Sequence, residues 1–302
     1  MRLRLVSLLA VGLVLVSCSS KEESELPSTG SIDASVTTPA PSTAAPTSVE
    51  SSTPDTTAAP TTTAVADPLT ILVTNDDGVS APGIDALVTA LSALPDVEVV
   101  VVAPAANQSG TSDSTTPGGV SVQDATTVSG HPAVAVDGFP ADAVNYALDQ
   151  LGLQPDVVVS GVNAGQNIGT FVPLSGTIGA ARVAARRGVP AIAISAGGLS
   201  GTDFATGAKV AADEVTALRG SLGWGENTDQ TVVNLNTPTC AAGTSIRGVE
   251  DVPVATAFPP GTNGLDLTFD CASTATDPAD DAVALTIGFA SRSIVAADLT
   301  AG

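Results

Sequence analysis

The stretch ILVTNDDGVSAPG, from Ile71 to Gly83, places two adjacent acids directly after an apolar run and directly before a helical pattern. In open parallel sheets, ligands bind at the carboxyl ends of the strands, so Asp76 and Asp77 lie where a substrate or a metal would be held. Asn, Asp and Gly are also common in tight turns and at helix starts. The stretch alone therefore predicts either a turn or a ligand site after the first strand of an α/β domain.

Strand-like and helix-like runs alternate after residue 68, and several of the strand-like runs are apolar throughout, as in strands buried on both faces. This alternation predicts an α/β fold with a mostly parallel, doubly wound sheet. Residues 161–175 are expected to form a long polar loop, and the segment after Cys240 a β-rich extension with hairpins. The expected strands are Leu69–Thr74, Val97–Ala103, Asp156–Ser160, Ala191–Ser195 and Thr231–Asn236; the expected helices are Pro82–Leu94, Ala141–Leu151, Gly176–Arg187 and Phe204–Leu218; Val120–Asp137 is expected to be a hairpin.

Residues 1–18 combine two arginines, an apolar stretch and small residues before Cys18, which is the pattern of a secretory signal peptide. Leu15–Cys18 resembles a bacterial lipobox, in which the cysteine carries the lipid; an ordinary signal peptide or an uncleaved anchor is the alternative. Residues 19–68 are mostly Ser, Thr, Pro and Ala, so they predict a disordered tether. We expect an exported protein that is lipid-anchored on the extracytoplasmic side of the membrane.

The remaining chain, residues 69–302, is long enough for one domain, with a core over about 69–236 and the extension over about 240–302. The whole sequence has 31 acidic and 10 basic residues, a net charge of −21. Binding to a nucleic acid duplex is disfavoured, because phosphate backbones require Lys and Arg. In an oxidising compartment, Cys240 and Cys271 predict a disulfide, with two buried free thiols as the alternative.

Three polar segments follow three of the expected strands: 74–78, 107–110 and 161–165. Such segments emerge at one edge of a doubly wound sheet, where they would gather two carboxylates, a hydroxyl and an amide carbonyl. An all-oxygen set suits Mg²⁺ or Mn²⁺. Zinc and a Ser-His-Asp triad are disfavoured, because His131 is the only histidine and precedes Pro132 in a segment that resembles a turn.

The segment SGTIGAA, from Ser175 to Ala181, begins an expected helix. Its small residues would let backbone N–H groups approach an anion, with the hydroxyls of Ser175 and Thr177 as further donors at the positive end of the helix dipole. An ordinary serine N-cap explains the same residues. The segment is a candidate phosphate site only in combination with the acidic pair.

These motifs together resemble the SurE family of survival proteins, which are metal-dependent 5′/3′-nucleotidases. The resemblance covers about residues 69–195 and rests on motifs that keep the family order and spacing. They are NDDG at 75–78, APG at 81–83, VVAPAANQSG at 101–110, DGFPAD at 137–142, PDVVVSGVNAGQNIG at 155–169, SGTIGAA at 175–181 and GVPAIAIS at 188–195.

The resemblance implies a Rossmann-like three-layer core, phosphomonoester substrates and a homodimer or homotetramer built with the C-terminal extension. It also implies a divalent metal held by Asp76, Asp77, Ser109 and Asn163. The chain departs from the family in two places. Ala105-Ala106 replaces a charged pair, and Val183 stands where an acid is expected.

Our hypothesis is a phosphomonoesterase that converts nucleoside monophosphates to nucleoside and phosphate by metal-activated water. The metal would be bound chiefly by Asp76 and Asp77. Asn75 would act with these acids in catalysis and would hold phosphate oxygens together with Ser175 and the Gly176–Thr177 backbone. The alternative is a surface lipoprotein that binds a nucleotide or phosphate without turnover. A receiver-like signalling domain also carries acids after its first strand, but export would separate it from cytoplasmic phosphodonors.

Overall fold

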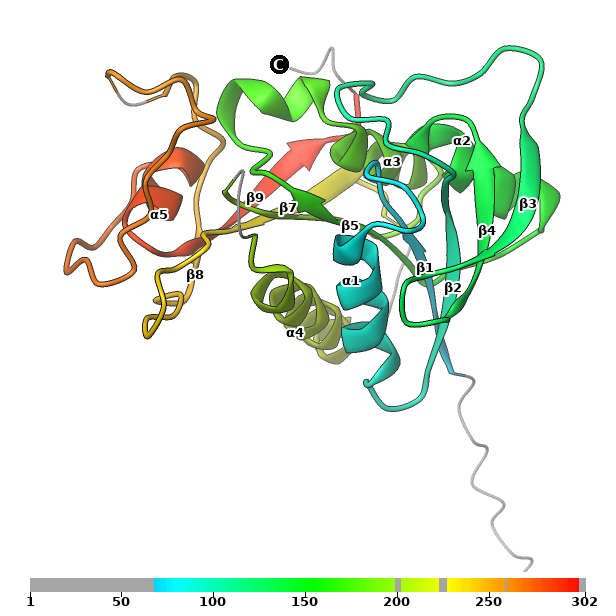
Figure 1. Ribbon diagram of the computed structural model, residues 1–302, viewed down its shortest axis with the longest axis horizontal. Helices are drawn as coiled ribbons and strands as arrows, with labels where there is room; N and C mark the ends of the chain where they lie inside the picture. Colours follow the sequence, from blue (N-terminus) through cyan, green and yellow to red (C-terminus); the bar gives the residue numbers. More distant parts are fainter. Residues whose placement is uncertain (1–67, 199–201, 223–226, 259, 299–302) are drawn as a thin grey trace, which may run out of the picture. The chain divides into compact units, whose positions relative to one another are not determined.

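The acidic pair follows a strand near the middle of a nine-stranded sheet, in the order β3-β4-β2-β1-β5-β6-β7-β9-β8 (Figure 1). The computed structural model of the 302-residue chain describes residues 68–198, 202–222, 227–258 and 260–298. The expected signal peptide and nearly all of the tether lie outside these residues. The strands are β1 Leu69–Thr74, β2 Val97–Pro104, β3 Ser121–Thr126, β4 Pro132–Asp137, β5 Val157–Ala164, β6 Ala191–Ala196, β7 Thr231–Thr237, β8 Val249–Asp251 and β9 Ala290–Ala296.

Every neighbouring pair of strands in this sheet is parallel except β3–β4 and β7–β9. The predicted α/β fold with a mostly parallel sheet is confirmed. The helical elements are α1 Pro82–Ser92, α2 Pro140–Asn145, the π-helical turn η1 Tyr146–Gln150, the 3-10 helix η2 Gly169–Leu174, α3 Gly176–Arg186, α4 Phe204–Leu222 and α5 Asp281–Thr286. Among the described residues, no helix is both long and apolar enough to cross a membrane.

Alternate residues of the central strands pack into two separate cores. In β1, Ile71 and Val73 face the core formed with α1 and α4, whereas Leu72 faces the core formed with α2 and α3. Successive side chains of a strand point to opposite faces, so a strand that is apolar throughout requires helices on both. Figure 1 shows this arrangement, with α1 and α4 on one face and α2 and α3 on the other.

The strand order places the acidic pair at a topological switch point. The chain leaves β1 for β2 on one side and later returns to β5 on the other side of β1. Connections on the two sides diverge, which leaves a crevice at the carboxyl ends of β1 and β5. Residues after β1 and at the end of β5 therefore meet at that edge.

The predicted boundary of the third parallel strand is wrong. The sequence indicates a strand that ends at Ser160 and a loop from 161, but β5 continues to Ala164. After a register shift, Asn163 and Ala164 pair with Ser195 and Ala196 of β6. These residues continue the strand because they pair with β6, which is distant in sequence. Local composition does not reveal such pairing.

The C-terminal extension is less β-rich than predicted. In the described part of 240–298, only β8 and β9 are strands, and they pair in parallel rather than as a hairpin. Side-chain hydrogen bonds hold much of the remainder. The buried Asp281 carboxylate, for example, accepts the N–H groups of Gly169 and Ala255. Such irregular backbone has no periodicity from which a sequence pattern could predict it.

A disulfide closes part of this extension. Cys240 and Cys271 are bonded, with their Cα atoms 5.7 Å apart and a separation of 31 residues in sequence. We call the segment they enclose, described over 240–258 and 260–271, the arm. A crosslink over a loop of this length restricts the unfolded chain and stabilises the fold by about 3–4 kcal/mol in the chain-entropy model.

Replacing both cysteines, Cys240→Ser with Cys271→Ser, should lower the free energy of unfolding by up to about 3–4 kcal/mol, because the unfolded arm regains its freedom. Urea unfolding followed by circular dichroism measures this change. Dithiothreitol should destabilise the parent protein similarly and leave the variant unchanged. Equal stability of parent and variant would contradict a stabilising bridge.

Candidate active site

The turn after β1 is built by Asn75. Its side-chain nitrogen donates to the carbonyl of Gly78 at 2.9 Å, and its side-chain oxygen accepts the Gly78 N–H at 3.2 Å. Gly78 has φ +101°, a conformation that strongly favours glycine. Asn75 is fully buried and shapes the turn that carries the acids. Its suggested contact with phosphate stays a prediction.

Asp76 is almost completely buried, with 2% of its surface exposed. The hydroxyl of Thr177 donates to its Oδ1 at 2.7 Å. Gly176 lies directly against the carboxylate, because a Cβ at this position would lie 2.8 Å from the Asp76 Cβ. The first turn of α3 is thus packed onto Asp76, and Gly176 and Thr177 contact the acid.

Burial raises the pKa of Asp76 from 3.8 to about 6. The hydrogen bond from Thr177 opposes this rise, and the charge of Asp77 adds to it. Burial also raises the pKa of Asp77, against the hydrogen bonds it accepts from Ala164 and Asn107. A pair of acids held where the charged form is costly is typical of a site that receives a cation.

Asp77 is held by two neighbouring segments of the site. Its Oδ2 accepts the backbone N–H of Ala164, at the end of β5, at 3.0 Å. Its Oδ1 accepts a hydrogen bond from the side-chain nitrogen of Asn107 at 3.0 Å. The predicted convergence of the polar segments 74–78, 107–110 and 161–165 is therefore present. Asn107 lies in the predicted polar segment 107–110, but its residue type alone does not indicate this contact.

A cavity of about 280 Å³, which we call the site pocket, lies at this edge of the sheet. Of the predicted site residues, it is lined by Asp76, Ser109, Asn163 and Ser175. Asn75, Gly176 and Thr177 do not line it, and Asp77 lies beside it through Ala164, which does. The structure therefore brings together an acid from the turn after β1, a hydroxyl from the loop after β2 and an amide from the end of β5, with a second acid adjacent.

Ser175 acts as the N-cap of α3, because its hydroxyl oxygen accepts the Ile178 N–H at 3.1 Å. The ordinary cap and the position at the pocket are compatible, since the residue both begins the helix and lines the cavity. The positive end of the α3 dipole is therefore directed at the pocket edge, where an anion would be stabilised.

Asn167 supports Asp76 through Thr177, although no sequence motif indicates this role. Its side-chain nitrogen donates to Thr177 Oγ1 at 3.4 Å and to the Ser195 hydroxyl at 2.9 Å. Asn236 of β7 accepts its N–H at 2.7 Å. This buried chain of hydrogen bonds links β6 and β7 to Asp76. The only sequence signal was a second asparagine in GVNAGQNIG.

The oxygen atoms available at the site suit a hard divalent cation. The hydrogen bond from Asn163 to Gly165 uses the amide nitrogen, so the remaining atom of the amide for a cation is Oδ1. Within the described residues, no cluster of three or more His, Cys, Asp and Glu side chains could bind a metal. A site with two carboxylates, a hydroxyl, an amide oxygen and water fits Mg²⁺ or Mn²⁺, because Mg²⁺ keeps several of its waters.

The only histidine and the positions that depart from the family pattern lie outside the pocket. His131 precedes β4, and its Nε2 lies 3.3 Å from the carbonyl oxygen of Val99. The backbone of Ala106 packs on Gly78, and Val183, a residue of α3, is buried in the core. At position 183 an apolar core side chain thus takes the place of the expected acid, whereas Ala105 and Ala106 are exposed.

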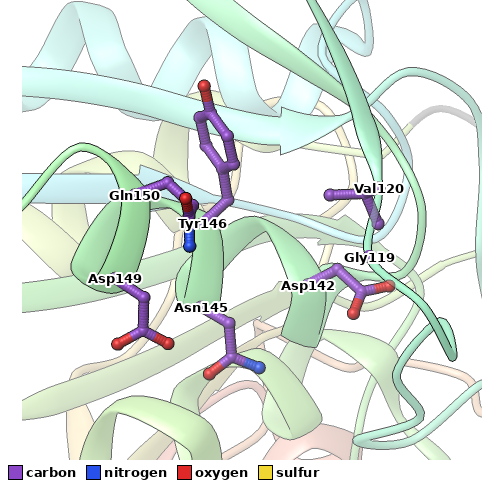
Figure 2. Close-up of a pocket in the computed structure, with 7 residues that line it drawn as sticks. All are labelled: Gly119, Val120, Asp142, Asn145, Tyr146, Asp149 and Gln150. Atoms are coloured by element: carbon purple, nitrogen blue, oxygen red, sulfur yellow. The ribbon is translucent and has the colours of Figure 1, made fainter. Parts of the chain in front are cut away.

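A larger depression of about 380 Å³ lies along α2 and η1 (Figure 2). Its acids already have partners, since Asp142 accepts hydrogen bonds from Thr116 and Phe139, and Asp149 pairs with Arg187. Figure 2 shows Tyr146 directed away from Asp149. None of the predicted site residues lines this depression, so its size does not make it the reactive centre.

Comparisons with known proteins agree with this geometry. A sequence model of the family described as "Survival protein SurE" matches residues 71–257. The chain belongs to this family.

A "5'-nucleotidase SurE" from Symbiobacterium thermophilum is 32% identical over 248 residues, which cover 76% of this chain and 93% of that protein. A "5'-nucleotidase SurE" from Halobacterium salinarum is 51% identical over 132 residues, 43% of this chain and 48% of the relative, so the match spans about half of that protein. The crystal structure of the SurE protein from Aquifex aeolicus superposes with a TM-score of 0.61 at 30% identity, covering 77% of this chain and 95% of that one.

The raised pKa of Asp76 predicts how the metal-free protein responds to pH. The folded protein holds this proton more tightly than the unfolded chain, so stability is highest below about pH 4 for this group and is lost as pH rises through about 6. A shift of this size corresponds to about 3 kcal/mol. Asp76→Asn should therefore be more stable than the parent at pH 7.5, with the difference shrinking towards pH 4.5.

Urea unfolding in EDTA at both pH values measures this difference. The matched control is Asp124→Asn, which removes an exposed carboxylate on β3. A stability difference between Asp76→Asn and parent that is the same at both pH values would rule out the buried charge as its cause.

Proposed function

We propose that this protein is a metal-dependent phosphomonoesterase that hydrolyses nucleoside monophosphates to nucleoside and phosphate. The observation that carries the proposal is the buried Asp76, paired with Asp77, beside a pocket lined by Ser109 and Asn163 at the β1/β5 switch point. Membership of a family whose curated relatives are named 5'-nucleotidases supports the substrate class.

Asp76, Asp77, Ser109 and Asn163 would hold a Mg²⁺ or Mn²⁺ ion. Such an ion neutralises charge on the phosphate and lowers the pKa of a water molecule that can attack phosphorus. The high cost of ionising Asp76 in the metal-free protein is removed when a cation is bound, so the buried acid favours an occupied site.

Side chains and backbone groups of the protein orient the two carboxylates and the phosphate. Thr177 and Asn167 keep the Asp76 carboxylate in one orientation. Asn107 and the Ala164 N–H do the same for Asp77. In our proposal, the positive end of the α3 dipole at Ser175 stabilises the phosphate oxygens. Asn75, Gly176 and Thr177 do not line the pocket, and they support it by shaping the turn after β1 and by packing on Asp76. Positioning and charge stabilisation then account for the reaction without a covalent phosphoenzyme.

Asp76→Asn should abolish phosphate release from AMP, GMP and UMP, lowering kcat/KM on the order of a hundredfold or more, because it weakens metal binding and leaves the sheet intact. Phosphate release is measured with Mn²⁺, with Mg²⁺ and with EDTA. Asp124→Asn, on β3 and away from the pocket, is the control and should retain the parental rate.

Parental turnover by Asp76→Asn would disprove the assignment of this residue. Tight binding of AMP by the parent protein without any release of phosphate would instead favour the alternative function, a nucleotide- or phosphate-binding lipoprotein.

We also propose that the protein is exported and held on the extracytoplasmic side of the membrane by a lipid on Cys18. The pattern of residues 1–18 and the long Ser/Thr/Pro-rich segment after it support this location. The folded domain would then reach nucleotides outside the cytoplasm, with the lipid as its only membrane attachment. The family resemblance supports assembly as a homodimer or homotetramer.

Cys18→Ser should abolish incorporation of a labelled fatty acid and move the protein from the membrane fraction to the soluble fraction, because the acceptor of the lipid is lost. Fractionation and metabolic labelling in a bacterial host measure both effects, with Ser19→Ala as the neighbouring control. A parent protein found without lipid would disprove the anchor.

A further inference from the structure

The site pocket has an apolar side that the phosphate chemistry does not require. Besides the polar residues, it is lined by Phe171, Leu174 and Leu265. Leu174 is 57% exposed and Leu265 is 47% exposed, although both are large apolar side chains. Ligand pockets commonly combine a few polar groups with apolar and aromatic walls, so these side chains indicate where the organic part of a substrate would lie.

Leu265 reaches the pocket from the arm, far along the sequence from the acidic pair. Gln166, which is buried and itself lines the pocket, donates from its side-chain nitrogen to the carbonyls of Gly264 and Leu265 at 2.5 and 3.3 Å. The side-chain oxygen of Asn263 accepts the N–H of Leu265 at 2.9 Å. The backbone on both sides of Leu265 is therefore held by hydrogen bonds.

Aromatic packing fixes the same part of the arm. The rings of Phe171 and Phe258 lie 5.1 Å apart between centroids. Gly264 packs on the Phe258 ring so closely that any side chain at position 264 would collide with it. Its φ of +77° also favours glycine. Phe258 thus connects the wall residue Phe171 to the turn that carries Leu265.

The C-terminal end of the arm is also held by contacts with the sheet domain. The ring of Phe269 lies against Gly197, where a Cβ would be 2.7 Å from the ring. Two residues later, the disulfide between Cys240 and Cys271 closes the arm. Leu265 is therefore an exposed apolar residue on a segment that is fixed at several points, as expected for a preformed ligand surface.

We propose that Leu265, together with Phe171 and Leu174, forms the subsite for the nucleobase of the substrate. The inference rests on the proposed phosphomonoesterase function and names the feature that favours nucleotides over small phosphate esters. An aromatic ring beside aliphatic side chains suits a flat, largely apolar group. Leu265 lies beyond residues 71–257, so this part of the pocket is contributed by the segment outside the family match.

The subsite recognises the base by contact area more than by hydrogen bonds. The polar ends of Gln166 are engaged by the protein, its nitrogen with the arm and its oxygen with the Gly198 N–H at 3.3 Å. Purines bury more apolar surface than pyrimidines, so AMP and GMP should be modestly better substrates than UMP.

Leu265→Ala should raise KM for AMP about five- to tenfold, because it removes most of the apolar contact, and should leave kcat within about twofold. It should leave kcat/KM for ribose 5-phosphate unchanged, since that substrate has no base. The matched control is Leu151→Ala, which shortens a similarly exposed leucine outside the site pocket and should change neither substrate. Leu265→Met should restore most of the AMP affinity.

Calorimetric titration with adenosine and with ribose, in EDTA, tests the subsite without turnover. The parent should bind adenosine more tightly than ribose, and Leu265→Ala should reduce the adenosine affinity about five- to tenfold. If no phosphate is released from any substrate while this difference persists, the proposed activity is wrong and the subsite stands. Equal losses for AMP and ribose 5-phosphate, or adenosine binding that is absent or unaffected by the substitution, would overturn the subsite.

Discussion

The contact on which the site depends is the hydrogen bond from Thr177 to the buried carboxylate of Asp76. It joins the turn after β1 to the beginning of α3, through two residues that are 101 positions apart in sequence. The absence of a side chain at Gly176 lets the helix approach closely enough for the bond to form. Asn167, held by β6 and β7, then supports Thr177 from the other side. A carboxylate is thus kept in a buried position, where its negative charge is costly.

The sheet makes this contact possible. Helices cover both faces of the apolar strands, so polar residues that bind a ligand are placed at the strand ends. The topological switch point between β1 and β5 opens a crevice at that edge. The acids come from the end of β1, the serine from the loop after β2 and the asparagine from the end of β5. The arm adds an apolar side to this polar edge. In our proposals, phosphate chemistry and recognition of the organic group therefore come from different parts of the chain.

Much of the central fold could be predicted from sequence, because its signals are local. Alternating apolar strands and amphipathic helices indicated the parallel sheet, and the acids after the first strand indicated its reactive edge. The prediction failed where pairing is long-range, as at Asn163, whose strand continues only because β6 provides partners. It failed again in the extension, where carboxylates and a disulfide hold irregular backbone. Side chains such as Asn107 and Asn167 showed no distinctive pattern, since their role is to orient acids contributed by another strand.

The sequence by itself determined the α/β class, the position of Asp76 and Asp77 after the first strand, and the oxygen-rich, histidine-poor chemistry of the site. These follow from periodicity and residue type, which are properties of short segments. Only the tertiary structure decided that Thr177 and Gly176 pack on Asp76, that Ser175 lines the pocket, and that Leu265 reaches the same cavity. Each of these depends on contacts between segments distant in sequence, and burial and close approach exist only once the chain has folded.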